Sequence, residues 1–292
     1  MSIEVLSDQR IASSGTLRFA RVAGRSSALF SRRWMKVWKG TAMAALLGLS
    51  LPAAILAIWT IAARMELVAP QILPMPSLVW ATTWDLTVSG DLPRELAVSL
   101  ARLAGGLLIG GALGLAFGLL FGLSRASEAY LGPTLRAIFL VPSLGWLPFF
   151  MMIFGIGETL KFVLIAKTCF LPLMVNVSGA IQTLPAKYHD VTRCLELSRQ
   201  ERLRYVIIPS VIPAIAIGLR QAIAKGWKTL ILVEMISSAA GIGYLMMWGR
   251  KSFQLDVVFA TMIVIALVGL LFDRAVLALQ QRTADWSLHT GG

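Results

Sequence analysis

Charged residues and potential metal ligands are scarce in this sequence. Only 14% of its 292 residues are charged, and it contains two cysteines, Cys169 and Cys194, and two histidines, His189 and His289. The cysteines would lie at different depths of a membrane and neither histidine belongs to a cluster with ligand spacing, so we expect no disulfide framework and no metal site. Catalytic and phosphate-binding patterns are also absent, which predicts that the chain is not an enzyme, has no catalytic residues and does not itself hydrolyse ATP.

Apolar residues are abundant instead. Hydrophobic side chains make up 57% of the sequence and the mean hydropathy is +0.75, values that are typical of an all-α polytopic membrane protein. Six segments are long and apolar enough to cross the lipid bilayer as helices, and they are 40–63, 95–123, 135–154, 160–184, 205–236 and 256–279. We therefore expect one six-helix transmembrane domain over residues 40–280.

The net charge of +12 is concentrated around these segments. Eight lysines and arginines precede residue 40, against two acidic residues. Because basic flanks of membrane helices stay in the cytoplasm, we expect residues 1–39 to be a basic cytoplasmic leader and residues 281–292 a cytoplasmic tail. The composition of the leader favours disorder, with folding on a partner as the alternative. Nucleic acid is not an expected partner, because no aromatic-interleaved basic fold precedes the membrane.

Glycine recurs at every fourth position of the second predicted span, and the repeating residues are Gly106, Gly110, Gly114, Gly118 and Gly122. A step of four turns a helix by about 40° beyond one full turn, so these positions form one slowly winding, nearly bare face. Such a face lets another helix backbone approach closely. Packing within one subunit is the favoured interpretation, and a seam between two copies is the alternative.

Several charged residues interrupt the later spans. Lys225 and Lys228 are three residues apart and so share a helix face. An ammonium group at the centre of a bilayer costs ~3 kcal/mol, which favours a water-filled cavity or a counter-charge, and an anionic solute suits either. The alternative is that the lysines snorkel or pair with Glu158 or Asp273. We predict a translocation pathway lined by Lys167, Lys225, Lys228 and Glu234.

A charged segment, residues 187–204, separates the fourth and fifth spans. It is too hydrophilic to enter the bilayer, so we expect it at the membrane surface. A helix over about residues 186–200 would place Tyr188, Val191 and Leu195 on one side, an apolar stripe ringed by charge. This pattern predicts a docking site for a soluble partner, and a solvated loop that only sets topology is the alternative.

Several strings, in this order and spacing, resemble a known family. They are 73–77 (LPMPS), 99–102 (SLAR), 154–162 (FGIGETLKF), 207–213 (IIPSVIP) with 218–220 (GLR), and 241–244 (GIGY). Together they resemble the permease subunit of bacterial ABC importers of aliphatic sulfonates, taurine, nitrate or bicarbonate, the binding-protein-dependent transport system inner membrane component. The resemblance covers about residues 41–287.

The resemblance implies a type I ABC importer permease fold in the bacterial inner membrane, with both termini cytoplasmic. It also implies a homodimer with a second copy of this chain, two cytoplasmic ABC ATPase subunits, and an external or periplasmic solute-binding protein. ATP and Mg would be bound by the ATPases, so this chain needs no cofactor of its own. The implied function is import of a small anionic solute by alternating access, with sulfonate, taurine, nitrate, bicarbonate or a carboxylate as candidates. An ion-coupled secondary transporter or a channel is the alternative, although no inverted repeat supports it.

The resemblance also places an ATPase-coupling helix in the charged segment. The residues that it implies for coupling are Tyr188, Asp190, Val191, Leu195, Glu196 and Ser198. Glu196 departs from the family pattern, because glycine is usual at that position. This departure raises the question of whether the tight turn after the coupling helix is kept. The alternatives are that the helix extends through this position or that the chain docks to a specialised ATPase.

Overall fold

The computed structural model describes residues 50–185, 192 and 194–289, and every regular element in this part of the chain is a helix. The described residues fall into two units, one within 1–68 and one within 69–292. The described part of the first unit contains the apolar helix Ser50–Arg64. The predicted leader, 1–39, and the start of the first predicted span, 40–49, lie outside the described residues.

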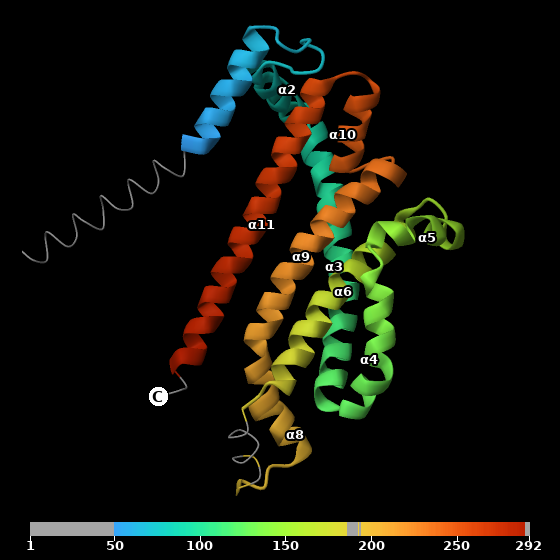
Figure 1. The fold of residues 1–292 in the computed structure, drawn as a ribbon, viewed down its shortest axis with the longest axis vertical. Coiled ribbons are helices and arrows are strands. Elements are labelled where there is room, and N and C mark those ends of the chain that lie inside the picture. The colour runs from blue at the N-terminus through green and yellow to red at the C-terminus, as the bar shows by residue number, and fades with distance from the viewer. Residues whose placement is uncertain (1–49, 186–191, 193, 290–292) are drawn as a thin grey trace, which may run out of the picture. The chain divides into compact units, whose positions relative to one another are not determined.

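The second unit is built from long helices (Figure 1). In chain order its elements are α2 (Pro76–Val88), α3 (Asp91–Leu123), α4 (Arg125–Leu140), η1 (Ser143–Trp146), α5 (Leu147–Phe154), α6 (Glu158–Gln182), α8 (Arg199–Arg202), η2 (Leu203–Ile207), α9 (Ile208–Ser237), α10 (Ile242–Lys251) and α11 (Leu255–His289). Within the described residues, four helices are long and apolar enough to cross a membrane, and the bent α4–η1–α5 pair would make five. The all-helical membrane class is therefore confirmed, whereas this count does not reach the six predicted spans.

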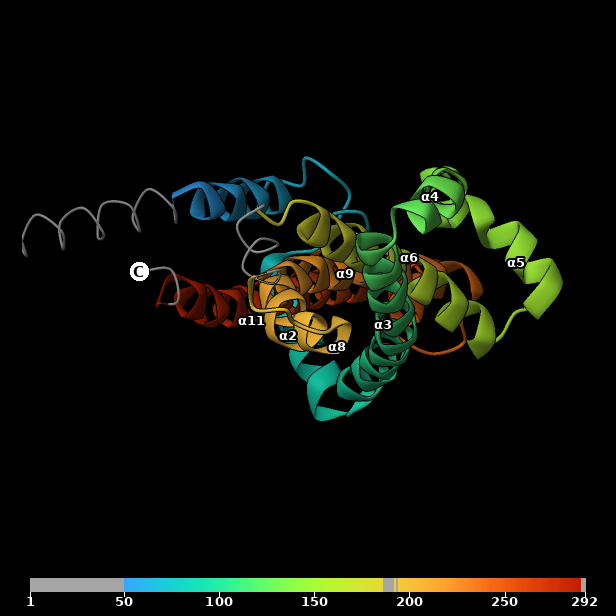
Figure 2. The same cartoon turned by 90° about the horizontal axis from the view of Figure 1, so that it is seen from below.

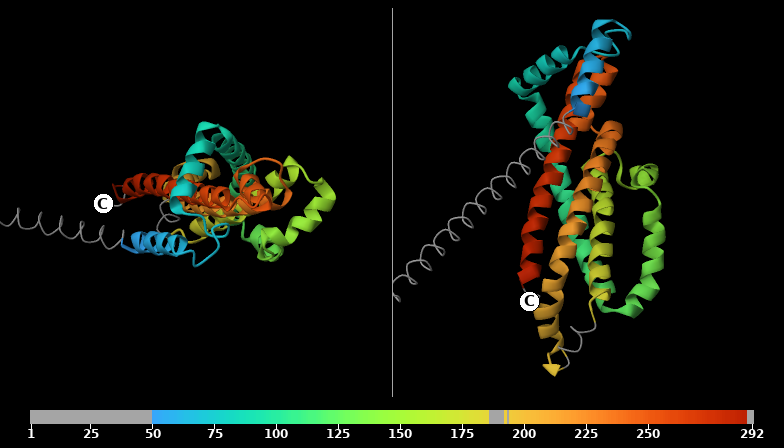
Figure 3. Two further views of the ribbon diagram at one scale, coloured as in Figure 1. Left: turned by 90° about the horizontal axis from the view of Figure 1, so that it is seen from above. Right: turned by 60° about the vertical axis from the view of Figure 1, so that its left-hand side comes forward.

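The prediction of one continuous helix over the third span, 135–154, was wrong. Its helix begins ten residues earlier, at Arg125, and the chain bends by 88° between α4 and the η1–α5 pair. Pro142 explains the break: it has no backbone N–H to donate, and it drives the preceding Val141 to an extended backbone with ψ 121°. Figures 2 and 3 show α4 and α5 on the side of the bundle away from α11.

The glycine face of α3 packs against α6. A Cβ atom on Gly110 would lie 2.1 Å from the Ala166 carbonyl oxygen, and one on Gly114 would lie 2.5 Å from the Phe170 carbonyl oxygen. Both contacts are to backbone atoms, so only glycine allows the two helices to lie this close. The predicted close approach is confirmed, and it occurs within one subunit.

A third long helix, α9, completes the core, in which the buried side chains Leu103, Ile165, Cys169 and Leu230 meet. Polar contacts then fasten α11 to α9. The Arg220 guanidinium donates two hydrogen bonds to the Asp273 carboxylate, at 2.8 and 3.0 Å. The core of α3, α6 and α9 thus fixes the positions of the charged side chains at both ends of these helices.

Candidate functional site

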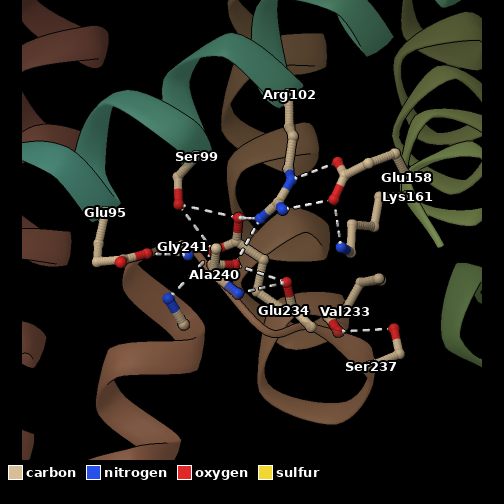
Figure 4. A network of polar contacts seen from close by, with 12 residues as sticks. Glu95, Ser99, Arg102, Glu158, Lys161, Val233, Glu234, Ser237, Ala240 and Gly241 are labelled. Carbon is tan, nitrogen blue, oxygen red and sulfur yellow. Dashed lines mark hydrogen bonds and ion pairs between the residues drawn. The ribbon is translucent and has the colours of Figure 1, made fainter. Parts of the chain in front are cut away.

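Charged side chains gather at one end of the core, where α3, α6 and α9 meet (Figure 4). Arg102 is the last charged residue of α3, Glu158 and Lys161 lie in the first turn of α6, and Glu234 lies in the last turn of α9. The charged segment 187–204 follows the other end of α6 and leads into α9. The cluster therefore lies at the end of the bundle opposite to that segment.

Arg102 is the centre of the cluster. Its Nε and Nη2 atoms donate to the two carboxylate oxygens of Glu158 at 2.7 and 2.6 Å. Its Nη1 atom donates to Glu234 at 2.8 Å and to the Ala240 carbonyl oxygen at 2.6 Å. Lys161 donates to Glu158 at 2.7 Å. The arginine therefore joins α3 to α6, to α9 and to the loop after α9.

Glu234 is fully buried, with 0% of its side chain exposed. Besides Arg102, it lies 2.8 and 2.9 Å from the Ser99 hydroxyl and accepts the Gly243 backbone N–H at 3.1 Å. The loop before α10 closes over the carboxylate, and a Cβ atom on Gly241 would lie 2.3 Å from it. Gly241 also has φ +112°, a backbone conformation that favours glycine. The second string in which the sequence resembles the family, SLAR, and the last, GIGY, thus meet around one buried carboxylate.

The sequence reading named Glu234 as a pathway residue, and the structure places it in this cluster. The parts that Arg102, Ser99 and Lys161 play in this cluster were missed. One signal for Arg102 was available, since it is followed by 22 residues without charge, 103–124, as at the edge of a membrane span. The pathway role of Glu234 stays a prediction.

The two predicted pathway lysines of α9, Lys225 and Lys228, are both exposed in the chain. Lys228 lines a cavity of about 150 Å³ that Arg220, Trp227 and Asp273 also line. The two acids named as alternative partners are engaged elsewhere: Asp273 pairs with Arg220, and Glu158 with Arg102 and Lys161. Within the described residues, therefore, neither acid pairs with Lys225 or Lys228.

Lys167, the fourth predicted pathway residue, lies at the break between α4 and η1. Its ammonium group donates to the Val141 carbonyl oxygen at 3.3 Å and lies 5.0 Å from the ring centroid of Phe139. It thus satisfies a carbonyl next to the break and does not partner Glu234. The neighbouring Thr168 hydroxyl lies 2.7 Å from Ser143 and 3.4 Å from Thr229, which links the break to α9 beside Lys228.

The coupling segment is described only in part, because Tyr188, Asp190 and Val191 lie outside the described residues. Leu195 is 64% exposed. The Ser198 hydroxyl accepts the Glu201 N–H at 3.3 Å and the Glu201 carboxylate accepts the Ser198 N–H at 2.9 Å, a capping box that begins the helix leading into α9. Hydrogen bonds therefore define the start of the helix that follows the turn of this segment.

Glu196 keeps the turn. It has φ +48°, and the Leu197 N–H donates to the Thr192 carbonyl oxygen at 3.1 Å. The helix does not extend through this position, so the chain adopts with glutamate the left-handed conformation for which glycine is suited.

This conformation makes position 196 sensitive to the shape of its side chain. We expect Glu196→Val to lower the free energy of unfolding by about 1–2 kcal/mol, because a β-branched residue is strained at positive φ. Glu196→Gly is the matched control and should cause no loss, since glycine adopts this φ freely. Melting temperatures of the purified variants test this, and equal values for the valine and glycine variants would contradict it.

The fold and these sites define a polytopic helical membrane subunit, and comparison with known proteins identifies its family. Residues 110–285 match the model of the binding-protein-dependent transport system inner membrane component. The chain belongs to this family of transport permeases, which confirms the resemblance found in the sequence.

Three bacterial relatives are similar over most of the chain. The aliphatic sulfonates transport permease protein SsuC of Escherichia coli (strain K12) is 38% identical over 81% of this chain and 90% of its own length. SsuC of Bacillus subtilis (strain 168) is 37% identical over 82% and 87%. The taurine transport system permease protein TauC of E. coli (strain K12) is 31% identical over 80% and 87%. A solved chain of the MetNI methionine ABC transporter, inward facing, has a TM-score of 0.48 and 18% identity, covering 62% of this chain and 92% of that one.

Proposed function

We propose that this chain is the membrane-spanning subunit of an ATP-driven importer that carries a small anion, with an organic sulfonate as the first candidate, into the cytoplasm. The observation that carries the proposal is the identity of 37 and 38%, over four fifths of the chain, with two permeases named for aliphatic sulfonates. The relative named for taurine, itself a sulfonate, supports the same solute class.

The proposed transporter contains the subunits that are typical of the family. A second copy of this chain completes the pathway, two cytoplasmic ATPase subunits bind ATP and Mg, and an external binding protein delivers the solute. The segment around Leu195, Glu196 and Ser198 receives the force of the ATPase, and the exposed Leu195 side chain supports this role. Force applied there passes into α6 and α9, since the segment joins these two helices.

The charges support a direction for the solute. The excess of Lys and Arg in the leader and in the charged segment favours a cytoplasmic position for that end of the bundle and for both termini. The Arg102 cluster then lies at the outer end, where solute arrives. A cavity of about 1100 Å³ lies near the inner end, and its charged lining residues are Arg125, Glu128, Arg136 and Arg202. Three arginines against one glutamate leave an excess of positive charge, which supports an anion exit there.

Uptake into vesicles tests the proposal. Vesicles that contain this chain, its co-purifying ATPase and a candidate binding protein should accumulate labelled ethanesulfonate or taurine only with ATP. A panel with nitrate, bicarbonate and a carboxylate defines the solute. Uptake driven by an ion gradient without ATP would contradict the proposal and favour a secondary transporter or channel.

The same assay tests the exposed lysines of α9. We expect Lys228→Ala and Lys225→Ala each to lower anion uptake about tenfold, since one charge at close range in a wet protein site contributes about 1–4 kcal/mol. Lys251→Ala, an exposed lysine at the end of α10, is the matched control and should leave uptake unchanged. If both α9 variants transport at the wild-type rate, the lysines do not contact the solute.

A further inference from the structure

Glu158 is the exposed member of an otherwise buried charge cluster. Its side chain is 54% exposed, whereas the cations that it contacts, Arg102 and Lys161, are 6% and 4% exposed. Three donors from these cations, the Nε and Nη2 of Arg102 and the Nζ of Lys161, converge on its two oxygens at 2.6–2.7 Å. Its carboxylate therefore separates two buried cations from solvent.

The two carboxylates of the cluster are held very differently. Glu234 is buried and fixed by Arg102, Ser99 and the Gly243 backbone. Every side-chain hydrogen bond of Glu158 in the described structure goes to one of the two cations, and Glu158 is the first residue of α6. Rotation of Glu158 into solvent would thus break contacts with Arg102 and Lys161 only and leave Glu234 in place.

The charges of the cluster then favour one kind of ligand. With Glu158 in place, two cations face two carboxylates. With Glu158 turned away, Arg102 still pairs with Glu234, whereas Lys161 has lost the acid with which it pairs in the described structure. One uncompensated positive charge and three unpaired donors remain. A planar or tetrahedral oxyanion with a single negative charge restores both the charge balance and the bidentate contact that a guanidinium prefers.

We propose that Arg102 and Lys161 form a binding subsite for a monovalent oxyanion, a sulfonate first, and that Glu158 occupies this subsite as an internal competitor when no solute is bound. This inference rests on the proposed function, because it takes the solute to be an anion that arrives at this end of the bundle. The competitor weakens binding, so that the site releases solute to the pathway and does not trap it.

Direct binding tests the subsite. We expect full-length Glu158→Gln permease, assembled with its ATPase in nanodiscs, to bind labelled ethanesulfonate at least about tenfold more tightly than the wild type, because the competing charge is removed and charge-assisted hydrogen bonds form. Adding Lys161→Met should abolish the gain. Equal affinity of Glu158→Gln and the wild type, or a gain that survives Lys161→Met, would overturn the proposal.

Asp91→Asn is the matched control, because Asp91 is an exposed carboxylate at the start of α3 whose side chain contacts Ser89, at 3.0 Å, and no cation of the cluster. It should leave ethanesulfonate binding unchanged, and an equal gain there would overturn the proposal by showing a general effect of net charge. If Glu158→Gln fails to fold, Glu158→Asp serves instead. Its shorter side chain competes less well, so an intermediate gain is expected, and no gain would be contrary to the subsite.

Failure of the subsite and failure of the proposed function give different results. The binding assay contains no ATP, so it does not depend on transport. A gain in Glu158→Gln together with an absence of ATP-driven anion uptake by the wild type supports the subsite and overturns the importer. Wild-type uptake of an anion without a gain in Glu158→Gln leaves the importer standing and overturns the subsite.

Discussion

Replacement of Arg102 by methionine is expected to lower the free energy of unfolding by about 3–5 kcal/mol, the cost of removing one partner from a buried ion pair. Methionine fills a similar volume but leaves Glu234 buried without its cation, and Glu158 without its bidentate partner. The Ala240 carbonyl oxygen also loses a donor at 2.6 Å. Unfolding of the purified variant in sodium dodecyl sulfate, with loss of helix packing as the signal, measures the effect.

Two further variants separate the ion pair from a general effect of losing an arginine. Arg94→Met is made on the same helix, two turns earlier, where the side chain is exposed, so it should change stability by less than about 0.5 kcal/mol. Adding Glu234→Gln to Arg102→Met should recover part of the loss, because the buried negative charge is removed with its partner. A double variant whose loss equals the sum of the single losses would show that the two residues do not act as a pair.

The long helices were predictable from the sequence because membrane burial selects long apolar runs. The predicted spans 95–123 and 160–184 correspond to α3 (Asp91–Leu123) and α6 (Glu158–Gln182), with boundaries that differ by at most four residues. Hydropathy does not detect a change of direction, so it read the α4–η1–α5 break as one span. Pro142 was a visible signal, but proline also occurs in merely bent membrane helices, and only the packing of η1 distinguishes the two.

The charged cluster was less predictable than the helices. Its main bonds join Arg102 to residues 56 and 132 positions away in the sequence. The partners come from three helices, so their meeting depends on how α3, α6 and α9 rotate against each other, which periodicity on one helix does not give. Glu234 was noticed because it interrupts an apolar run, but hydropathy along one helix does not identify Arg102 as its partner. The turn at Glu196 was equally hard to predict, since only the backbone conformation shows that the turn forms with glutamate at this position.

The glycine face of α3 supports a second prediction with a large effect on stability. We expect Gly110→Ala to lower the free energy of unfolding by about 3 kcal/mol, the upper end of the usual cost of overpacking. The added methyl group would lie 2.1 Å from the Ala166 carbonyl oxygen and 2.7 Å from its Cα atom. These are backbone atoms of α6 in the middle of a helix, so no side-chain rotation relieves the contact and the two helices must separate. The melting temperature of the purified protein measures the loss.

Gly111→Ala is the matched control, on the next residue of the same helix. Its methyl group would meet only the Leu173 Cδ1 atom, at 3.3 Å, the end of a flexible side chain. Alanine also favours the helix over glycine by about 1 kcal/mol, so the net change should be small or stabilising. If the two variants lose stability equally, the cause is the general removal of glycine from α3. If only Gly110→Ala loses it, the close approach of α3 and α6 holds the helix that carries Arg102 against the one that carries Glu158.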